Sequence, residues 1–499
     1  MTAAESPISI PPPTGIYAEP FSLRKFGRLL GSFGPAAVVA SLSLGAGETI
    51  MVCGLGSWSE FGLLWLLVLS VLIRGVVVMY LVGRYSAVTG QSFAQRIAML
   101  PGPRGWLLML FVAGELAVLA TGLTAIAKPC GDLGVFILSE KLGMRETLGL
   151  DNPDTSRLWV NGITTLFQAA ALTVSLCSSY VALEKQQILV CSLVVLGTGA
   201  ATLFVGPNLV ELFLGAIRFG HLPPAPEWAP PAAKNEYGLN LATIFGYVGG
   251  GLSGYIAYSS WVGLHGWGLA GNETARERAR RSTRYDYLPN DPQQAANLRR
   301  LLTPLRWDVA LGTAVLLAIT VAFLSAGATV LYPKHLSPGA GEEFSLLTKQ
   351  AVIWEQIGGW LVPVYYVAIL LALWGTIASV PEAVARVTYD LLTAARPDAG
   401  RVSFRTVLTV LVAWFFLSSQ FWNWGGFKFD LLTQIGALVT VNLGVGIVCL
   451  LATYYNATLP PLYRTPKWLT VCGIVAGVIL LIAFAVTAVG MWAKVVGSG

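Results

Sequence analysis

The sequence predicts an all-α polytopic membrane protein with about eleven transmembrane helices. Of its 499 residues, 55% are hydrophobic and only 12% are charged, whereas soluble globular chains carry about 25% charged residues. Eleven apolar stretches are long enough to cross the hydrocarbon core of a bilayer, roughly 30 Å or about 20 helical residues. This composition argues against a soluble enzyme and excludes a disordered or disulfide-stapled chain. The six cysteines contain no Cys-x-x-Cys pair that would indicate a zinc or redox site.

The predicted spans follow the hydropathy of the chain. Glycine, proline and serine occur inside most of them, which membrane helices tolerate where neighbouring helices satisfy the freed backbone groups. In order, the spans cover residues 29–53, 61–83, 105–127, 158–180, 187–206, 239–264, 307–331, 356–385, 406–422, 431–454 and 468–492.

Basic residues predict the orientation of these spans. Lys and Arg gather before span 1 and in the connections between spans 2 and 3, 6 and 7, and 8 and 9, so we expect these segments in the cytoplasm. Residues 1–22, which lack the apolar stretch of a signal peptide, are then a cytoplasmic tail, and the C-terminus lies outside the plasma (inner) membrane. We interpret the arginines between spans 6 and 7 as topogenic, rather than as a site for nucleic acid or anionic lipid: Arg276, Arg278, Arg280, Arg281, Arg284, Arg299, Arg300 and Arg306.

Two of the spans contain glycine runs that predict broken helices. Span 1 has Gly45 and Gly47 beside the carboxylate of Glu48, and span 6 has five glycines within residues 246–254. Each glycine weakens a helix by about 1 kcal/mol relative to alanine. Interrupted helices five spans apart are typical of inverted five-helix repeats with a midplane substrate site. The pattern predicts a LeuT-type secondary transporter, with a first repeat over 23–210 (spans 1–5), a second over 211–460 (spans 6–10), and span 11 with the C-terminus over 461–499.

Four short motifs add a resemblance to a known family. They are Gly34-Pro35-Ala36, Val88-Thr89-Gly90, the seven residues Glu115-Leu-Ala-Val-Leu-Ala-Thr121, and Tyr258-Ser259-Ser260. At these places the chain resembles the Nramp family of proton-coupled divalent metal transporters, as a divergent member. The resemblance implies eleven spans, an inside N-terminus and symport of a divalent metal ion.

The positions of the family's functional residues are largely changed. Its metal-binding Asp and Asn correspond to Gly45 and Glu48, and its Met-Pro-His corresponds to Gly251-Leu252-Ser253. Its second histidine corresponds to Tyr258, and its tenth-helix glutamine corresponds to Gln434. Its two third-helix proton acids correspond to Gly122 and Ala125. The resemblance therefore implies a retained scaffold with an altered manganese and iron site.

Glu48 is the strongest single candidate for a ligand. A carboxylate near the bilayer centre costs about 2.5–3.5 kcal/mol, so it should face a cavity or a partner. We expect an all-oxygen site for a hard cation such as Mg²⁺ or Mn²⁺, with metal ligands at Glu48, Gly45, Gly251 and Gln434. The wider substrate-binding set adds Gly47, Thr49, Ser253 and Tyr258, with Ser43 nearby. The alternative is a structural Glu48, as a protonated cap or in an ion pair.

Two other charges are predicted deep in the bundle. We expect Arg74 in span 2 to pair with Glu115 in span 3, because a pair compensates two isolated buried charges. Arg405 is the rival partner, and Glu115 is also a candidate for proton coupling. Glu382 and Arg386, one helical turn apart, should pair along span 8.

The sequence supports one leading function and one alternative. The leading hypothesis is a secondary-active transporter of a divalent metal cation, and the alternative is transport of a small organic or monovalent solute, with Tyr255, Tyr258 and Trp261 as a cation cage. There is no His-Glu-x-x-His, Gly-x-Ser-x-Gly or P-loop string, so we expect no enzymatic activity and no resident cofactor. The expected partners are the lipid bilayer and the transported ion or solute, and no nucleic acid.

Overall fold

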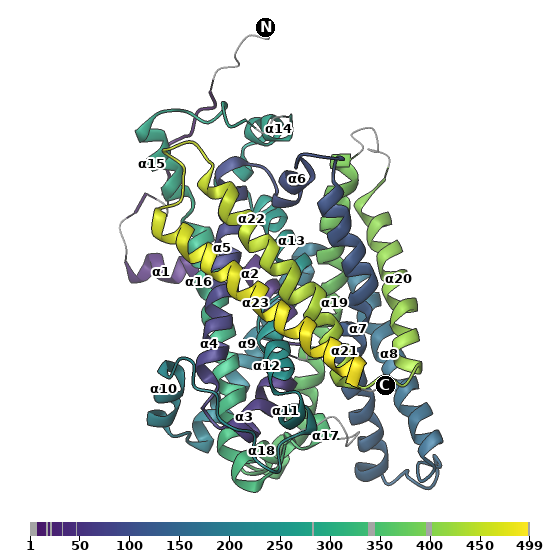
Figure 1. Ribbon diagram of the computed structural model, residues 1–499. Helices are drawn as coiled ribbons and strands as arrows, with labels where there is room; N and C mark the ends of the chain where they lie inside the picture. The colour runs from purple at the N-terminus through teal and green to yellow at the C-terminus, as the bar shows by residue number, and fades with distance from the viewer. Residues whose placement is uncertain are drawn as a thin grey trace.

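The computed structural model describes residues 7–15, 18–19, 22–31, 33–45, 47–281, 284–337, 345–395 and 402–497. Within these ranges all regular secondary structure is helical. The long helices run side by side as one bundle, with the N-terminus, α14 (Glu273–Arg281) and α15 (Pro292–Leu301) at one end (Figure 1). The predicted all-α fold is confirmed.

Nine helices are long and apolar enough to cross a membrane, by length and composition, among the described residues. They match nine of the eleven predicted spans and cover Leu64–Thr89 (α4 and α5), Trp106–Lys141 (α7), Pro153–Cys177 (α8), Tyr180–Val205 (α9), Pro292–Lys334 (α15 and α16), Gly359–Ala394 (α19), Phe404–Trp424 (α20), Phe429–Ala457 (α21 and α22) and Lys467–Val496 (α23). The other two predicted spans are the broken ones. Shorter helices lie in the connections: α6 (Phe93–Ala98), α10 (Leu209–Ile217), α11 (Pro231–Asn235), α17 (Ser345–Thr348) and α18 (Ala351–Glu355).

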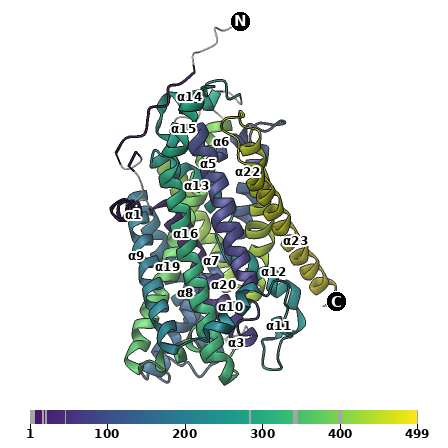
Figure 2. The ribbon, with the colours of Figure 1, turned by 90° about the vertical axis from the view of Figure 1, so that its left-hand side faces the viewer.

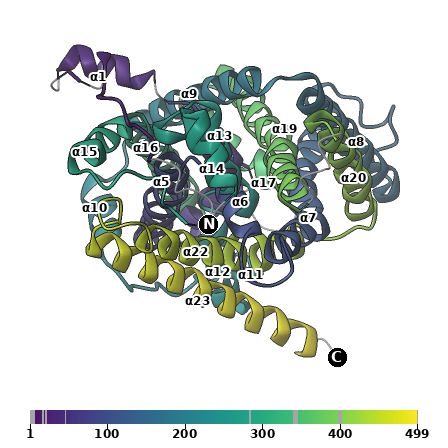
Figure 3. The same ribbon diagram turned by 90° about the horizontal axis from the view of Figure 1, so that it is seen from above.

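Burial divides the spans into an inner and an outer set. The apolar windows of Leu64–Thr89, Pro292–Lys334 and Phe429–Ala457 are each 61% buried, whereas that of Tyr180–Val205 is 28% buried. Large apolar side chains stay exposed on the outer helices, where only lipid would be an apolar environment. Figures 2 and 3 show α23 along the outside of the bundle, next to α22.

Span 1 is interrupted where the glycines predict it. Helix α2 covers Pro35–Ser43, and after the interruption a π-helical segment (Gly47–Val52) leads into α3 (Cys53–Ser59), at an angle of 49° to α2. The predicted start of the span at residue 29 is too early. Leu23–Leu30 form a separate short helix, α1, because Ser22 caps it and Gly31 ends it.

Span 6 is also interrupted, and the two gaps face each other as predicted. Four residues separate the end of helix α12 (Tyr237–Tyr247) from the start of α13 (Leu252–Leu264). Gly249, in this gap, has φ +122°, a backbone conformation that residues with a side chain rarely adopt. A Cβ at Gly47 would overlap with the backbone carbonyl of Tyr247, so only glycine permits this approach of the two gaps.

Side chains of span 2 satisfy the backbone that the gap in span 6 sets free. The Ser70 hydroxyl lies 2.7 Å from the carbonyl oxygen of Phe245 and 2.8 Å from that of Val248. The Arg74 guanidinium donates to the carbonyl oxygen of Gly250, over 3.5 Å. The break is therefore a stable feature of the bundle rather than an unpaired loop.

Candidate functional site

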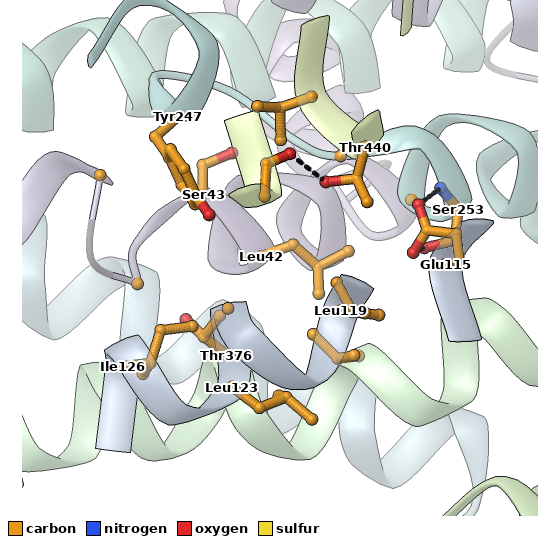
Figure 4. A pocket seen from close by; sticks show the side chains of 18 of the residues that line it. Leu42, Ser43, Glu115, Leu119, Leu123, Ile126, Tyr247, Ser253, Thr376 and Thr440 are labelled. Carbon is orange, nitrogen blue, oxygen red and sulfur yellow. Dashed lines mark hydrogen bonds between the residues drawn. The ribbon is translucent and has the colours of Figure 1, made fainter. Parts of the chain in front are cut away.

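A cavity of about 70 Å³ lies between the two broken helices, close to the middle of the bundle. Its wall includes both gaps and parts of α7, α19 and span 10 (Figure 4). The glycines and polar residues of the wall are Ser43, Gly45, Gly47, Glu115, Gly122, Tyr247, Gly249, Gly251, Ser253, Gly254, Thr376, Gly436 and Thr440. Of the predicted substrate-binding residues, the cavity thus contains Gly45, Gly47, Gly251 and Ser253.

Glu115 supplies the carboxylate of this cavity. It comes from α7, is 2% exposed, and accepts hydrogen bonds from the backbone N–H and the hydroxyl of Ser253, both over 3.3 Å (Figure 4). Ser253 lies in the first turn of α13, directly after the gap in span 6. The carboxylate therefore joins span 3 to the start of the second half of span 6.

Hydroxyl groups provide most of the other polar atoms in the wall. Ser43, Thr376 and Thr440 donate to the backbone carbonyls of Val39, Ser41 and Gly436, over 3.1, 2.8 and 3.0 Å. Because each hydroxyl has one hydrogen and two lone pairs, these oxygens keep lone pairs for a ligand. Hard oxygen atoms of this kind suit Mg²⁺, Ca²⁺ and Mn²⁺.

Glu48 is buried behind the cavity wall and is not part of it. Its side chain is fully buried, and neither carboxylate oxygen has a hydrogen-bond partner of good geometry. The groups that act on it electrostatically are the backbone N–H of Gly249 and the guanidinium of Arg74. Gly47, the first residue of the π-helical segment, lines the cavity, whereas the next residue, Glu48, does not.

The predicted ion pair between Arg74 and Glu115 does not form. Besides its bond to Gly250, Arg74 donates to the Ser70 hydroxyl and to the side-chain carbonyl of Asn442, each over 3.2 Å. The carboxylate that interacts with Arg74 is Glu48, on the other broken helix, without a direct ion pair. The rival partner, Arg405, is exposed at the start of α20.

Thr49 and Gln434 lie outside the cavity, contrary to prediction. Thr49 donates to the carbonyl of Gly45 over 2.5 Å. Gln434 is buried, donates to Glu236 over 3.1 Å and accepts from Lys494 over 3.4 Å. The cavity-lining residue of its helix is Gly436, which at 100° per residue points about 160° away from Gln434.

Tyr258 also lies away from the cavity, and the aromatic cage does not form. The Tyr258 hydroxyl donates to Asp308 over 2.8 Å, and the Trp261 indole donates to Glu382 over 2.9 Å. Tyr255 turns back to accept from the backbone N–H of Gly250. The predicted pair of Glu382 and Arg386 is confirmed, with 2.7 Å between the carboxylate and Nε.

Asp308 is a functional candidate that the sequence analysis missed. It lies in α16, is fully buried, and accepts bonds from the backbone N–H groups of Gly34 and Ala36, over 2.9 and 3.0 Å. These are the first amides of α2, so Asp308 caps the first half of span 1 from another helix. An acidic residue at the very start of span 7 was the available signal.

The described residues contain no group of three His, Cys, Asp or Glu side chains that could hold a metal ion. A cation in the cavity would therefore be held by one carboxylate, hydroxyls and backbone carbonyls. Such a donor set is weak and suits a passing substrate better than a resident cofactor.

Solved structures with a similar fold are transporters. A mutant of a manganese transporter from Eremococcus coleocola matches with a TM-score of 0.62 at 12% identity, over 100% of this chain and 91% of that one. The same transporter in complex with an aromatic bis-isothiourea compound matches with a TM-score of 0.60 at 15% identity, over 99% and 92%. MhsT in complex with L-phenylalanine matches with a TM-score of 0.50 at 14% identity, over 91% and 98%. These likenesses establish the LeuT-type fold.

The sequence itself identifies the family. No curated protein is similar enough in sequence to match the chain. The family model described as natural resistance-associated macrophage protein-like, however, matches residues 36–489, which include both broken helices and the cavity. The chain therefore belongs to the Nramp family and is a multi-pass membrane transporter of the Nramp type.

Proposed function

We propose that the protein is a secondary-active transporter of a divalent metal cation that prefers oxygen ligands, such as Mg²⁺ or Mn²⁺. One observation carries the proposal: among the residues that the structure describes, the wall of the cavity between the two broken helices has a single carboxylate, Glu115, several hydroxyl oxygens, and no Met, Cys or His. Soft or borderline metals favour thiolate, thioether and imidazole ligands, whereas this wall offers hard oxygen. The fold neighbour that transports manganese supports the same cargo class.

The cavity has room for an ion that keeps part of its water. Its volume of about 70 Å³ is well above the roughly 10–15 Å³ that one water molecule needs. A cation that keeps one or two waters therefore fits this space. We therefore propose a partly hydrated ion, bound by Glu115 and Ser253 with the backbone of Gly45 and Gly251.

Glu48 has a separate role in this proposal. Glu48 is fully buried and does not line the cavity, so in this proposal its carboxyl group is part of the bundle and not a ligand of the transported ion. The positions that resemble the family's proton acids, Gly122 and Ala125, cannot carry a proton. We propose that uptake depends less on a proton gradient than in other Nramp transporters.

We also propose the orientation and the remaining properties expected from the sequence. The arginines of α14 and α15 lie at the N-terminal end of the bundle, which supports a cytoplasmic N-terminus and an external C-terminus in the plasma membrane (Figure 1). The proposed repeats are 23–210 and 211–460, followed by residues 461–499, which form span 11 and the C-terminus outside both repeats. The proposal includes no catalytic activity, no resident cofactor and no nucleic-acid partner.

Uptake into proteoliposomes tests the proposal, with Mn²⁺ and Mg²⁺ compared with amines and amino acids, each with and without a pH gradient. We expect saturable divalent-cation uptake that persists without the gradient and that is abolished in Glu115→Gln. The matched control is Glu140→Gln, the same change on the exposed end of the same helix. Unchanged uptake of every divalent cation by Glu115→Gln would contradict the proposed site.

A further inference from the structure

A second cavity, of about 310 Å³, lies at the end of the bundle that carries the N-terminus. It is enclosed by α14, the ends of α5 (Met79–Thr89) and α13, and parts of α6 and α19, and it shares no wall residue with the cavity between the broken helices. Figure 3 shows α14 across the ends of the central helices, beside α13 and α6. This cavity has no role in the function described above.

The wall of this second cavity is rich in arginine. Arg276 and Arg280 come from successive turns of α14, and Arg386 comes from α19, against one carboxylate, Asp390. The side chains of Arg276 and Arg280 make no hydrogen bond or ion pair with any residue that the structure describes. Both are exposed and, four residues apart, lie on the same side of α14, whereas their neighbours Ala275 and Ala279 are buried.

The third arginine and the carboxylate are already held in place. Arg386 is fixed by its 2.7 Å ion pair with Glu382 and lies over the ring of Phe404, with 4.1 Å to the centroid. Asp390 accepts hydrogen bonds from the hydroxyls of Ser92 and Ser260, over 2.8 and 2.9 Å. Its charge is therefore partly compensated by these donors and by the nearby Arg280. The net charge of the cavity is positive.

We propose that this cavity binds a phosphate-bearing anion. Arginine forks match the oxygens of a phosphate group in a bidentate manner, and two such forks one turn apart can hold different oxygens of one group. A cation is excluded by the three guanidinium groups. The volume is at the lower end of the roughly 300–1,000 Å³ of small-molecule sites, enough for a phosphate and part of its attached group. The anion is either soluble or the headgroup of a lipid.

The position of the cavity gives the bound anion a regulatory effect. A phosphate between α14 and α19 would tie the second half of span 6, through Ser260 of its wall, to span 8. Movement of α13 relative to α19 would then be restrained, and transport would slow. This regulatory step rests on the proposed function, whereas the binding itself does not.

Direct binding to the purified full-length protein tests the proposal independently of transport. Calorimetry with inorganic phosphate and ATP forms one arm, and fluorescence binding to nanodiscs with and without phosphatidylglycerol forms the other. We expect at least a tenfold loss of affinity in Arg276→Ala/Arg280→Ala. The control is Arg24→Ala/Arg300→Ala, which removes the same charge from exposed positions outside the cavity.

A gain-of-affinity variant keeps the test valid if the arginine variant folds poorly. Asp390→Asn removes the opposing charge and keeps an oxygen for the two serine hydroxyls, so it should bind phosphate more tightly than the wild type. Arginine-dependent binding of inorganic phosphate or ATP would assign the site to a soluble anion. Arginine-dependent binding that is seen only with phosphatidylglycerol would assign it to a lipid headgroup. No binding in either arm, or equal affinity in both double variants, would overturn the proposal.

Discussion

The cap that Asp308 places on α2 predicts a large loss of stability when its charge is removed. Asp308 accepts three hydrogen bonds, from the amides of Gly34 and Ala36 and from the hydroxyl of Tyr258. In Asp308→Asn one oxygen remains, which can take the Oδ2 place and keep the bonds from Ala36 and Tyr258, whereas the new NH₂ group then faces the Gly34 N–H, which cannot accept a bond. Helix α2 has no side-chain cap of its own that would compensate.

The size of the effect follows from these contacts. Hydrogen bonds to a charged group contribute about 1.5–3 kcal/mol each and neutral ones about 0.5–1.5 kcal/mol, so replacing three of the first kind by two of the second lowers the free energy of unfolding by about 3.5–6 kcal/mol in Asp308→Asn. Tyr258→Phe loses only one and should lower it by about 1.5–3 kcal/mol. Asp286→Asn, at an exposed position before α15, is the control and should change it little.

Equilibrium unfolding of the purified protein in mixed detergent micelles, followed by tryptophan fluorescence, measures these differences. The order of stability should be wild type and Asp286→Asn, then Tyr258→Phe, then Asp308→Asn. If Asp308→Asn unfolds within about 0.5 kcal/mol of Asp286→Asn, the cap does not hold α2 and the reasoning from these contacts is refuted.

Three further predictions concern the broken helices. Arg74→Met removes the donor to Gly250, Ser70 and Asn442 together with a positive charge that acts on Glu48, and should lower the free energy of unfolding by about 1–3 kcal/mol; adding Glu48→Gln should restore part of it, and a double variant no more stable than the single one would contradict the coupling. Gly47→Ala forces a methyl group onto a backbone carbonyl and should cost about 1–3 kcal/mol, whereas Gly162→Ala, with open space around it, should not destabilise. Gly251 lines the cavity, and a Cβ there would meet only Val441, at an ordinary contact distance of 3.7 Å. Gly251→Met should therefore place a thioether at the cavity, so competition assays should show a shift from Mg²⁺ toward softer metals such as Cd²⁺; an unchanged selectivity would place the cargo elsewhere.

The spans and the two breaks could be predicted from the sequence because they depend on local composition. Long apolar stretches must cross the membrane, and dense glycine runs cannot hold a regular helix there. The breaks at Gly47 and Gly249 therefore appeared as expected, apart from the early start assigned to span 1. The i to i+4 pair of Glu382 and Arg386 is local in the same sense.

The partners of buried charges could not be predicted, because they depend on which helix faces turn toward each other. Burying Arg74 or Glu115 without a partner costs free energy. The sequence does not show that Asn442 accepts a hydrogen bond from Arg74 and that Ser253 donates one to Glu115. The position of Gln434 depends on the helical register just before a π-helical segment, which begins at Ala437.

The aromatic cage was wrong for a reason of geometry. Side chains three residues apart on a helix are rotated by about 60° from perfect alignment, so Tyr255 and Trp261 lie about 120° apart. Each of these side chains then finds a partner on a different element, Gly250 and Glu382. Three-residue spacing over two steps does not define one face.

The most direct test of the account is to locate the bound cation in a crystal structure of the full-length protein with Mn²⁺, from its anomalous scattering. The account predicts a peak between the two breaks, with Mn²⁺ about 2.0–2.6 Å from a carboxylate oxygen of Glu115 or from a bridging water. It also predicts that the peak disappears in Glu115→Gln. A protein that transports Mn²⁺ but shows its peak at Glu48 and Gln434, or anywhere outside this cavity, would contradict the account.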